Sequence, residues 1–424
     1  MRVLHVLSQR PSHTGSGITL KALISGGNKR DIDSAAVIGV PAVCKDPVLD
    51  ELPKEKVFRV PFETEALPFP VPGMSDVMPY PSTRFSCLDE PDLERYRKAW
   101  LNVLRKACDV FRPDVIHSHH VWIVSSLVKD AAPEVKQVIH CHATGLRQME
   151  LCPALAEEVM QGCRRADVFC VLHDGHGSEL SNRLIESRSN DAGVWPGRTC
   201  SRIHVVGAGY RDDIFKSGPA DSSDRVPGVS RLIYVGKYSG AKGLPQLLDA
   251  FEILTGVHQD VELHVAGSGA GEEARMLEER MKSMAPRVVL HGQVSQEELA
   301  EIMQGCEVCV LPSFYEGVPL VLVEALGCGC RLVSTALPGV VAGIVPHVGD
   351  AIELVDLPRL ESVDKPVSAD IPAFTQRIAD ACERALEKGR FQGDLRRDLE
   401  ARLSHFTWDA VFERVHDIWK SLCS

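Results

Sequence analysis

The sequence predicts an α/β protein built from two successive doubly wound parallel sheets. The chain has 424 residues, more than one typical domain holds. Short apolar runs alternate with helical patterns from the first residues, and this rhythm restarts after a segment rich in Gly, Pro, Ser and Asp at residues 216–228. We therefore expect an N-terminal domain at 1–215, an interdomain linker at 216–228, and a C-terminal domain at 216–407.

The individual elements follow from the position of each apolar run. In the first half, buried strands are expected at 3–7, 35–40, 115–117, 137–140 and 168–172, and helices at 93–111 and 153–162. The Pro-rich residues 51–90 are expected to form an irregular excursion from the sheet. In the second half, strands are expected at 231–235, 261–266, 288–290, 307–311 and 331–334. Because such sheets bind ligands at the carboxyl ends of their strands, a cleft between the domains is the expected site.

The last part of the chain, residues 408–422, has the pattern of an amphipathic helix. Phe412, Val415 and Trp419 lie on one side of it. A helix with one apolar side needs a surface to cover, and we expect the segment 408–424 to pack back onto the N-terminal domain.

Charge and composition narrow the class of partner. The net charge is −11, with 26 basic and 27 acidic residues in 1–215 and 21 and 31 in the remainder. No basic stripe is available to neutralise phosphates along a strand, so nucleic acid is not expected as a partner. The near-neutral first half leaves a peripheral contact with a membrane surface open.

The sequence contains no run of about 18 apolar residues, so no membrane-spanning helix is expected. The apolar start turns polar after seven residues, which is too short for the apolar part of a signal peptide. Many of the 14 cysteines lie inside apolar runs such as 168–172. That placement is typical of small buried residues in a reducing cytoplasm.

The segment 311–327 has the sequence LPSFYEGVPLVLVEALG and carries the clearest functional pattern in the chain, with two glutamates eight positions apart. A strand is expected to end at Leu311, a loop to carry Glu316, and a helix to begin around Pro319 and to carry Glu324. Backbone N–H groups at the start of that helix, together with its dipole, favour an anion such as a diphosphate. The binding residues expected in this segment are Glu316, Gly317, Val318, Pro319, Leu320 and Glu324.

A second element, YVGKYSGAKGL at residues 234–244, follows an expected strand. Gly236 turns the chain, and Lys237 and Lys242 flank a short loop before a helix. Lysine suits a diphosphate because it is a compact positive charge. The same site is expected to include Gly267, in VAGSG at 265–269, where glycine allows close approach of the backbone to a ligand, and a second segment, LHGQVS at 290–295, also follows an expected strand. Each of these two segments is also typical of a plain tight turn.

Together these motifs resemble family 4 of the retaining glycosyltransferases, which contains sucrose-phosphate synthases and bacterial mannosyltransferases and has the GT-B fold. The segment 311–327 is similar to the Glu-x7-Glu motif of that family, which implies that Glu316 holds hydroxyls of the donor sugar and Glu324 those of the ribose. The segment 234–244 resembles the Gly-Arg-x4-Lys-Gly element of the family. Lys242 matches its lysine, whereas Lys237 stands in the arginine position and loses the bidentate fork. The resemblance also places the nucleobase near Val294.

The first half contributes a glycine-containing loop at residues 9–19, where the first strand meets a helix. This loop lacks the full G-x-G-x-x-G of a dinucleotide site. In the family that the chain resembles, such a loop faces the donor diphosphate and the acceptor, which implies donor-side roles for Gly15 and Gly17. A structural turn is the alternative.

Histidines at 117–120 and 140–142 raise the question of a metal site. We predict none, because His117 and His140 fall inside expected buried strands and no carboxylate completes a ligand set. Cys306 and Cys309 are expected in the core. The resemblance implies that His142 approaches the reacting carbon of the donor sugar and that His119 lies on the acceptor side, with a core position as the alternative for each.

The implied reaction moves a hexosyl group from a nucleoside diphosphate sugar to an acceptor hydroxyl with retained anomeric configuration. The expected catalytic residues are His142, Lys242, Lys237 and Glu316. The lysines and the helix N-terminus would stabilise the departing diphosphate, so neither a metal nor a cofactor is expected. We expect a uridine diphosphate (UDP) sugar rather than a GDP or ADP sugar. The alternatives are a catalytically silent sugar-nucleotide-binding protein and a sugar-nucleotide epimerase of the same fold, and the acceptor and the oligomeric state stay unassigned.

Overall fold

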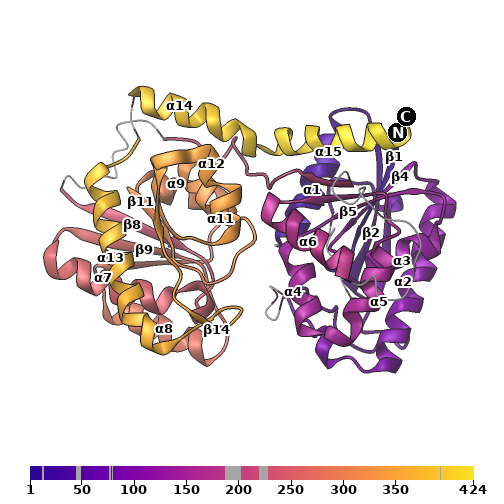
Figure 1. Cartoon of the computed structure of the whole chain (residues 1–424), viewed down its shortest axis with the longest axis horizontal. Helices are drawn as coiled ribbons and strands as arrows, with labels where there is room; N and C mark the ends of the chain where they lie inside the picture. Colours follow the sequence, from indigo (N-terminus) through magenta and orange to yellow (C-terminus); the bar gives the residue numbers. More distant parts are fainter. Residues whose placement is uncertain are drawn as a thin grey trace. The chain divides into compact units, whose positions relative to one another are not determined.

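The chain forms two compact units (Figure 1). The N-terminal unit comprises Met1–Ala208 and Trp408–Ser424, and the C-terminal unit comprises Gly209–Thr407. The change of unit after Ala208 lies seven residues before the expected domain end at residue 215, and 219–227 of the expected linker lie outside the described residues. The computed structural model describes residues 1–11, 14–43, 49–75, 78, 80–186, 202–218, 228–391 and 393–424.

The N-terminal unit contains a seven-stranded sheet in the order β3-β2-β1-β4-β5-β6-β7, and all its paired neighbours are parallel. The strands are β1 (Arg2–Leu7), β2 (Asp33–Pro41), β3 (Val57–Phe62), β4 (Val115–His119), β5 (Lys136–His140), β6 (Val168–Val171) and β7 (Ile203–Val205). The five strands expected from apolar runs are present, and β4 continues two residues beyond the expected end to include His119. The strand order changes direction between β1 and β4, which is where such sheets bind ligands.

Strand β3 corrects the expectation that residues 51–90 form only an irregular excursion. It pairs in parallel with β2 from Val57 to Phe62. The sequence pattern did not predict a strand here, because Pro61 lies within it and proline cannot donate a hydrogen bond to a neighbouring strand. The strand lies at the edge of the sheet, where one side of its backbone needs no partner strand.

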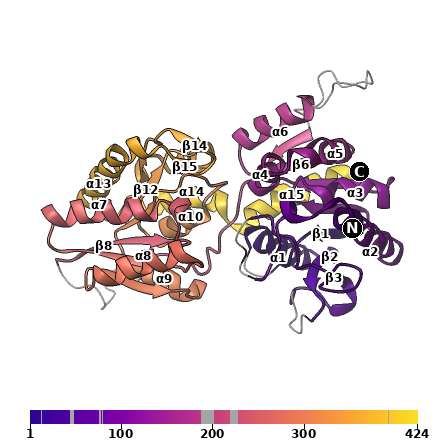
Figure 2. The same cartoon turned by 90° about the horizontal axis from the view of Figure 1, so that it is seen from below.

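Helices cover both faces of this sheet (Figure 2). One core joins the sheet to α2, α3, α5 and α6, and the cores on the other face involve α1 and α15. The helices are α1 (Gly15–Asn28), α2 (Glu90–Phe111), α3 (Ile123–Ala131), α4 (Ala143–Leu151), α5 (Pro153–Cys163), α6 (Asp174–Glu186) and α15 (Trp408–Cys423), with short 3-10 turns at η1 (Lys54–Lys56) and η2 (Phe85–Cys87).

Helix α15 belongs to the N-terminal unit although it ends the chain. It packs against α1 and β4, and its buried face carries Phe412, Val415 and Trp419, as the amphipathic pattern predicted. A Cβ atom at Gly26 of α1 would lie 2.3 Å from the Phe412 ring, so only glycine allows this close packing. Lys29 and Arg30, directly after α1, form ion pairs with Asp409 and Glu413 of α15.

The C-terminal unit repeats the same topology. Its six-stranded parallel sheet has the order β10-β9-β8-β11-β12-β13, so the direction changes between β8 and β11. The strands are β8 (Ser230–Val235), β9 (Val261–Ala266), β10 (Val288–Gly292), β11 (Val308–Leu311), β12 (Arg331–Thr335) and β13 (Ile352–Val355), and a small antiparallel pair consists of β14 (Leu360–Ser362) and β15 (Lys365–Pro366). All five strands expected in this half are present.

Both faces of this second sheet are buried, which is typical of parallel sheets. Leu232 and Tyr234 of β8 pack with α7, α8 and α13, whereas Ile233 packs with α9, α10 and α14. The helices are α7 (Leu244–Val257), α8 (Glu272–Ser283), α9 (Gln296–Gln304), α10 (Leu320–Gly327), α11 (Pro338–Gly343), α12 (Val345–Val348), α13 (Ile371–Lys388) and α14 (Gly393–Leu403), with 3-10 turns η4 (Gly240–Lys242), η5 (Gly349–Ala351), η6 (Ser368–Asp370) and η7 (Ser404–Phe406).

Two general expectations concern the described part of the chain. No described helix is long and apolar enough to cross a bilayer. Cys306 and Cys309 are buried in the core as expected.

Candidate functional site

The loops that follow β8 and β11 are tied together at the point where the strand order changes. The Phe314 amide donates a hydrogen bond of 3.0 Å to the carbonyl oxygen of Ala241. Gly243 has a φ of +67°, and a Cβ atom there would lie 2.1 Å from the Pro312 carbonyl oxygen. Glycine is therefore required on both grounds. This close approach brings the side chain of Lys242 to the loop that carries Glu316.

Lys242 and Glu316 form an ion pair, with 2.6 Å between Nζ and Oε1. The Ser313 hydroxyl donates to the same carboxylate oxygen at 3.0 Å. The side chains of Lys242 and Glu316 are 26% and 19% exposed, so the pair is only partly screened by water. The structure thus brings together two residues that the sequence predicted from separate motifs, 74 positions apart.

Glu324 lies on α10, one turn into the helix, and is half-buried. Burial raises the pKa of its carboxyl group to about 7, because desolvation disfavours the ionised form. A half-buried carboxylate of this kind gains from ligand hydroxyl groups that donate hydrogen bonds to it. We call Lys242, Ser313, Glu316 and Glu324 the C-terminal cluster.

The start of α10 differs slightly from the expectation. Pro319 is the N-cap residue rather than part of the first turn, and the helix begins at Leu320. The N-cap residue Pro319 provides no side-chain hydrogen bond to this N-terminus, so among the described residues its first backbone N–H groups have no side-chain cap. Such a terminus carries partial positive charge and favours an anion.

Three neighbouring loops contain the weaker predicted residues Gly236, Gly267 and Val294. The Gly236 amide donates to the Ala266 carbonyl at 3.0 Å, and the Gly267 amide donates to the Gly292 carbonyl at 2.7 Å. Gly267 has a φ of +139°, and a Cβ atom there would lie 1.9 Å from the Gly236 carbonyl oxygen. Packing between loops is therefore enough to explain this glycine. Val294 precedes Ser295, which caps α9.

Lys237 follows Gly236 in the first of these loops. Its carbonyl oxygen accepts a hydrogen bond of 2.7 Å from the buried Tyr234 hydroxyl. This contact fixes the backbone of Lys237 directly after β8, at the carboxyl end of the strand.

In the N-terminal unit, Gly15 and Gly17 lie in the first turn of α1, which Thr14 caps. The Gly17 amide donates to the Thr14 hydroxyl oxygen at 3.1 Å, and a Cβ atom at Gly17 would lie 1.7 Å from the Pro11 carbonyl oxygen. Local packing thus requires glycine at 17. At Gly15 a Cβ atom would meet no atom of the described residues within 4 Å. Ser12 and His13 of this loop lie outside the described residues.

His119 and His142 come together at the carboxyl ends of β4 and β5. His119 is the last residue of β4, and His142 is the N-cap residue of α4, so the loop expected after 142 is a helix start. Their ring nitrogens Nδ1 and Nε2 lie 3.0 Å apart. Both residues are buried, at 2% and 8% exposure, and burial together with neighbouring histidines lowers their pKa well below the usual value. Both rings are therefore neutral at pH 7.

Four more histidines surround this pair: His5, His117, His120 and His140. All are buried. Burial lowers the pKa of His5 and His120 to about 3 and that of His140 to about 4. We call these six residues the histidine cluster. His117 and His140 were predicted to be buried, and this is confirmed.

The sequence did not indicate the roles of His120 and Trp419 in this region. His120 has a φ of +70°, rare for a residue other than glycine, and its Nδ1 lies 3.1 Å from the Thr144 hydroxyl. Such strain is frequent near functional sites. Trp419 reaches the cluster from α15, which no local pattern links to β4. The only sequence signal was its place on the apolar face of that helix.

Solved structures identify the class of fold. The chain matches sucrose-phosphate synthase from Thermosynechococcus elongatus with a TM-score of 0.68 and 16% identity, over 100% of this chain and 99% of the other. It matches Anabaena HepE, solved in complex with UDP and glucose, with a TM-score of 0.65 and 16% identity over 99% and 100%. The two Rossmann-like units thus have the GT-B fold.

The sequence comparisons point to one family. Residues 229–357 match the model of the family Glycosyl transferases group 1. The chain is 25% identical over 293 residues to a glycogen synthase of Mycobacterium tuberculosis, covering 65% of each protein. It is 29% identical over 159 residues to a D-inositol 3-phosphate glycosyltransferase of Mycolicibacterium smegmatis, covering 36% of each. The chain therefore spans less than two thirds of the length of these relatives.

Proposed function

We propose that the chain is a retaining glycosyltransferase that moves a hexosyl group from a nucleoside diphosphate sugar to an acceptor hydroxyl without a metal ion. The observation that carries this proposal is the Lys242–Glu316 ion pair close to the uncapped start of α10. A cation and free N–H groups suit a diphosphate, and carboxylates suit sugar hydroxyls. The family match of residues 229–357 and the names of the two relatives support the same class of reaction.

In the proposed reaction, the bond between the anomeric carbon and the diphosphate oxygen breaks, and its electron pair leaves with the diphosphate. The acceptor oxygen bonds to the same carbon, and its proton passes to the diphosphate oxygen that leaves. Lys242 and Lys237 would neutralise the charge that develops on the diphosphate. Glu316 would accept hydrogen bonds from sugar hydroxyls, and His142 would lie near the reacting carbon.

The remaining residues complete the proposed site. Glu324 would accept hydrogen bonds from the ribose hydroxyls, and His119 would lie on the acceptor side. A UDP sugar is the proposed donor, which the UDP and glucose bound by HepE support. The other proposed donor contacts are Gly15, Gly17, Gly236, Gly267, Val294, Gly317, Val318, Pro319 and Leu320.

Nucleotide binding separates the proposal from its alternatives. Isothermal calorimetry of the full chain with UDP, GDP, ADP and NAD should show the tightest binding for UDP. Preference for NAD would contradict the proposal. Binding of UDP without transfer to any acceptor hydroxyl would point to a silent binding protein, and exchange at a sugar carbon without transfer would point to an epimerase.

The stereochemistry and the metal requirement can be tested in one tube. Proton NMR of fresh product, formed in excess chelator, should show transfer with the anomeric configuration of the donor. The physical basis of the metal-free half is that lysines and backbone N–H groups lie where metal-dependent enzymes place a cation. Activity that is lost in chelator and restored by added manganese would contradict the metal-independent reaction. An inverted anomeric configuration in the product would contradict retention.

A further inference from the structure

Trp419 is the one residue of α15 with a described hydrogen bond into the histidine cluster. It is fully buried, and its ring meets the rings of His117 and His5 edge-on, with centroids 5.5 and 5.8 Å apart. Its indole Nε1 lies 3.0 Å from His117 Nδ1. An indole nitrogen can only donate, so His117 Nδ1 must accept.

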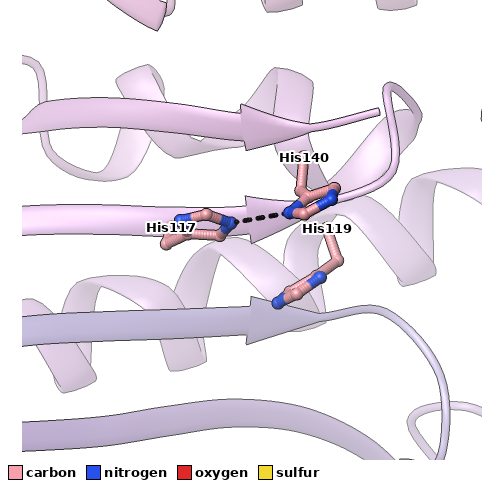
Figure 3. A group of neighbouring side chains, drawn as sticks. All are labelled: His117, His119 and His140. Carbon is pink, nitrogen blue, oxygen red and sulfur yellow. Dashed lines mark hydrogen bonds between the residues drawn. The ribbon is translucent and has the colours of Figure 1, made fainter. Parts of the chain in front are cut away.

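This single donor determines where the protons lie on two rings. Because Nδ1 of His117 accepts, a neutral His117 carries its proton on Nε2. That nitrogen faces His140 Nδ1 at 3.4 Å, as the dashed line in Figure 3 shows. His140 Nδ1 must then accept in turn, so a neutral His140 also carries its proton on Nε2. Burial lowers the pKa of both histidines, which keeps the rings neutral.

The same geometry opposes a metal ion among these rings. His117, His119 and His140 each offer a nitrogen within 4.8 Å of the others, which is a grouping that could attract zinc. Zinc binds an unprotonated nitrogen at about 2.0–2.1 Å. The His117 nitrogen that faces His140 carries a proton as long as Trp419 donates to the other one, so it cannot serve as a ligand.

We propose that Trp419 is a positioning residue, which fixes His117 and His140 in their Nε2–H tautomers and thereby orients the rings of His119 and His142. His140 stacks on His142 with a centroid distance of 4.6 Å and an interplanar angle of 8°, and on His119 at 5.8 Å and 11°. The opposite tautomer of either ring alone would set two N–H groups or two lone pairs against each other at 3.4 Å. If both rings changed, the Nδ1–H group of His117 would face the indole N–H group of Trp419 at 3.0 Å. The consequence for catalysis rests on the proposed function, but the tautomers do not.

Two-bond proton–nitrogen NMR on the full chain labelled with ¹⁵N-histidine tests the tautomers directly. Signals are assigned from those lost in His117→Gln and His140→Gln. The wild type should show an unprotonated Nδ1 and a protonated Nε2 for both rings. Trp419→Phe keeps an aromatic ring but removes the donor, and should convert both histidines to tautomer mixtures. A protonated Nδ1 on His117 in the wild type would overturn the proposal, even if the variant failed to fold.

Trp122→Phe is the matched control. Trp122 is also buried in the N-terminal unit and close in sequence to His119, but its indole nitrogen has no hydrogen-bond partner among the described residues. This variant should leave both tautomers unchanged. Tautomers that shift equally in both tryptophan variants would contradict a specific role of the Trp419 N–H group.

Zinc binding gives a second test of the tautomers. Zinc added to chelator-treated protein should not bind stoichiometrically, and stoichiometric zinc that is lost in His117→Gln would overturn the assignment.

Kinetics test the consequence for catalysis. Trp419→Phe should lower kcat on the order of tenfold, with KM for the donor within about twofold of the wild type, because the displaced rings act on the reacting groups. Absence of transfer in every protein, with the wild-type tautomers as stated, would contradict the proposed function and leave the tautomer assignment standing. An unchanged kcat with altered tautomers would contradict the catalytic part.

Discussion

The C-terminal cluster follows β8 and β11 of one parallel sheet, whereas the histidine cluster lies on β1, β4 and β5 of the other, and the two clusters treat charge in opposite ways. Lys242 and Glu316 pair a cation with an anion on half-exposed loops. The histidine cluster instead holds neutral rings that are almost completely buried. The first arrangement can exchange its internal partner for a charged ligand. The second can orient a ligand, but it resists protonation.

Because of this contrast, acid should affect the stability of the two units differently. The largest expected effect is a loss of stability of the N-terminal unit. An unfolded histidine has a pKa near 6.5, whereas the folded pKa is about 3 for His5 and about 4 for His140. The unfolded chain thus binds more protons, and stability present above about pH 6.5 is lost as the pH falls toward 4. At pH 5.5 each such histidine costs about 1 kcal/mol. The cluster together should cost several kcal/mol.

Tryptophan fluorescence measures this unit selectively, because all five tryptophans lie within residues 1–208 and 408–424. Urea midpoints followed by fluorescence should fall steeply between pH 7.5 and 5.5. His5→Leu removes one buried titrating group and should reduce the slope, whereas His258→Leu, whose side chain is 42% exposed, should not. A fluorescence midpoint independent of pH would mean that the rings are not held neutral.

The second prediction concerns the charged pair. Lys242→Ala should lower kcat by about 100-fold or more, because the lysine meets charge that develops on the leaving group. Its effect on UDP affinity should be smaller, since in the proposed site the bare nucleotide would also contact the start of α10 and Glu324. Initial rates and calorimetry measure the two effects separately.

Lys282→Ala is the matched control, because Lys282 forms an ion pair of the same 2.6 Å length with Glu278, but on an exposed helix. Such exposed pairs contribute about 1 kcal/mol or less, so this variant should behave as the wild type. Turnover of Lys242→Ala within about threefold of the wild type would assign the leaving-group role elsewhere, with Lys237 as the next candidate.

The two clusters also differ in how far the sequence could predict them. The residues of the C-terminal cluster come from two short continuous motifs, and their strands, loops and helix were expected near their observed positions. Glu316 and Lys242 meet because each follows the carboxyl end of a strand, and β8 and β11 are neighbours in the parallel sheet. The alternation of strands and helices already indicated that these ends lie on the same side of the sheet. What the motif did not indicate is their direct ion pair, which depends on the close approach of Gly243 to Pro312.

The histidine cluster was only partly predictable. The strand pattern placed His117 and His140 in the core. His119 and His142 lay beyond the ends of the expected strands and were predicted only from the family resemblance, although alternation puts positions 117 and 119 on the same face of β4. The contact with Trp419 joins residues 302 positions apart, and no periodicity carries such information. Strand β3 was missed for a different reason, because a proline that is tolerated at a sheet edge looks like a break in the sequence.

The last prediction concerns Glu324, for which affinity and stability should change in opposite directions. In the proposed site the ionised carboxylate would accept ribose hydrogen bonds worth about 1.5–3 kcal/mol, so Glu324→Gln should weaken UDP binding at pH 8 by about tenfold or more. Since the pKa of the free protein's Glu324 is about 7, wild-type affinity should fall as the pH drops from 8 to 6. The affinity of Glu324→Gln should not follow this change. Calorimetry over this range measures both, with exposed Glu301→Gln as the control that follows the wild type.

Stability should move the other way, because the folded pKa of Glu324 lies above its unfolded value near 4.5. The folded state then binds more protons, so the stability present below about pH 4.5 is lost as the pH rises to 7. Above pH 7 the buried charge costs about 3 kcal/mol, an upper value that solvent relaxation reduces. Glu324→Gln should therefore raise the thermal midpoint of the nucleotide-free protein at pH 8, and the gain should shrink toward pH 5. A variant that loses both affinity and stability at pH 8 would show that Glu324 is a structural residue of α10.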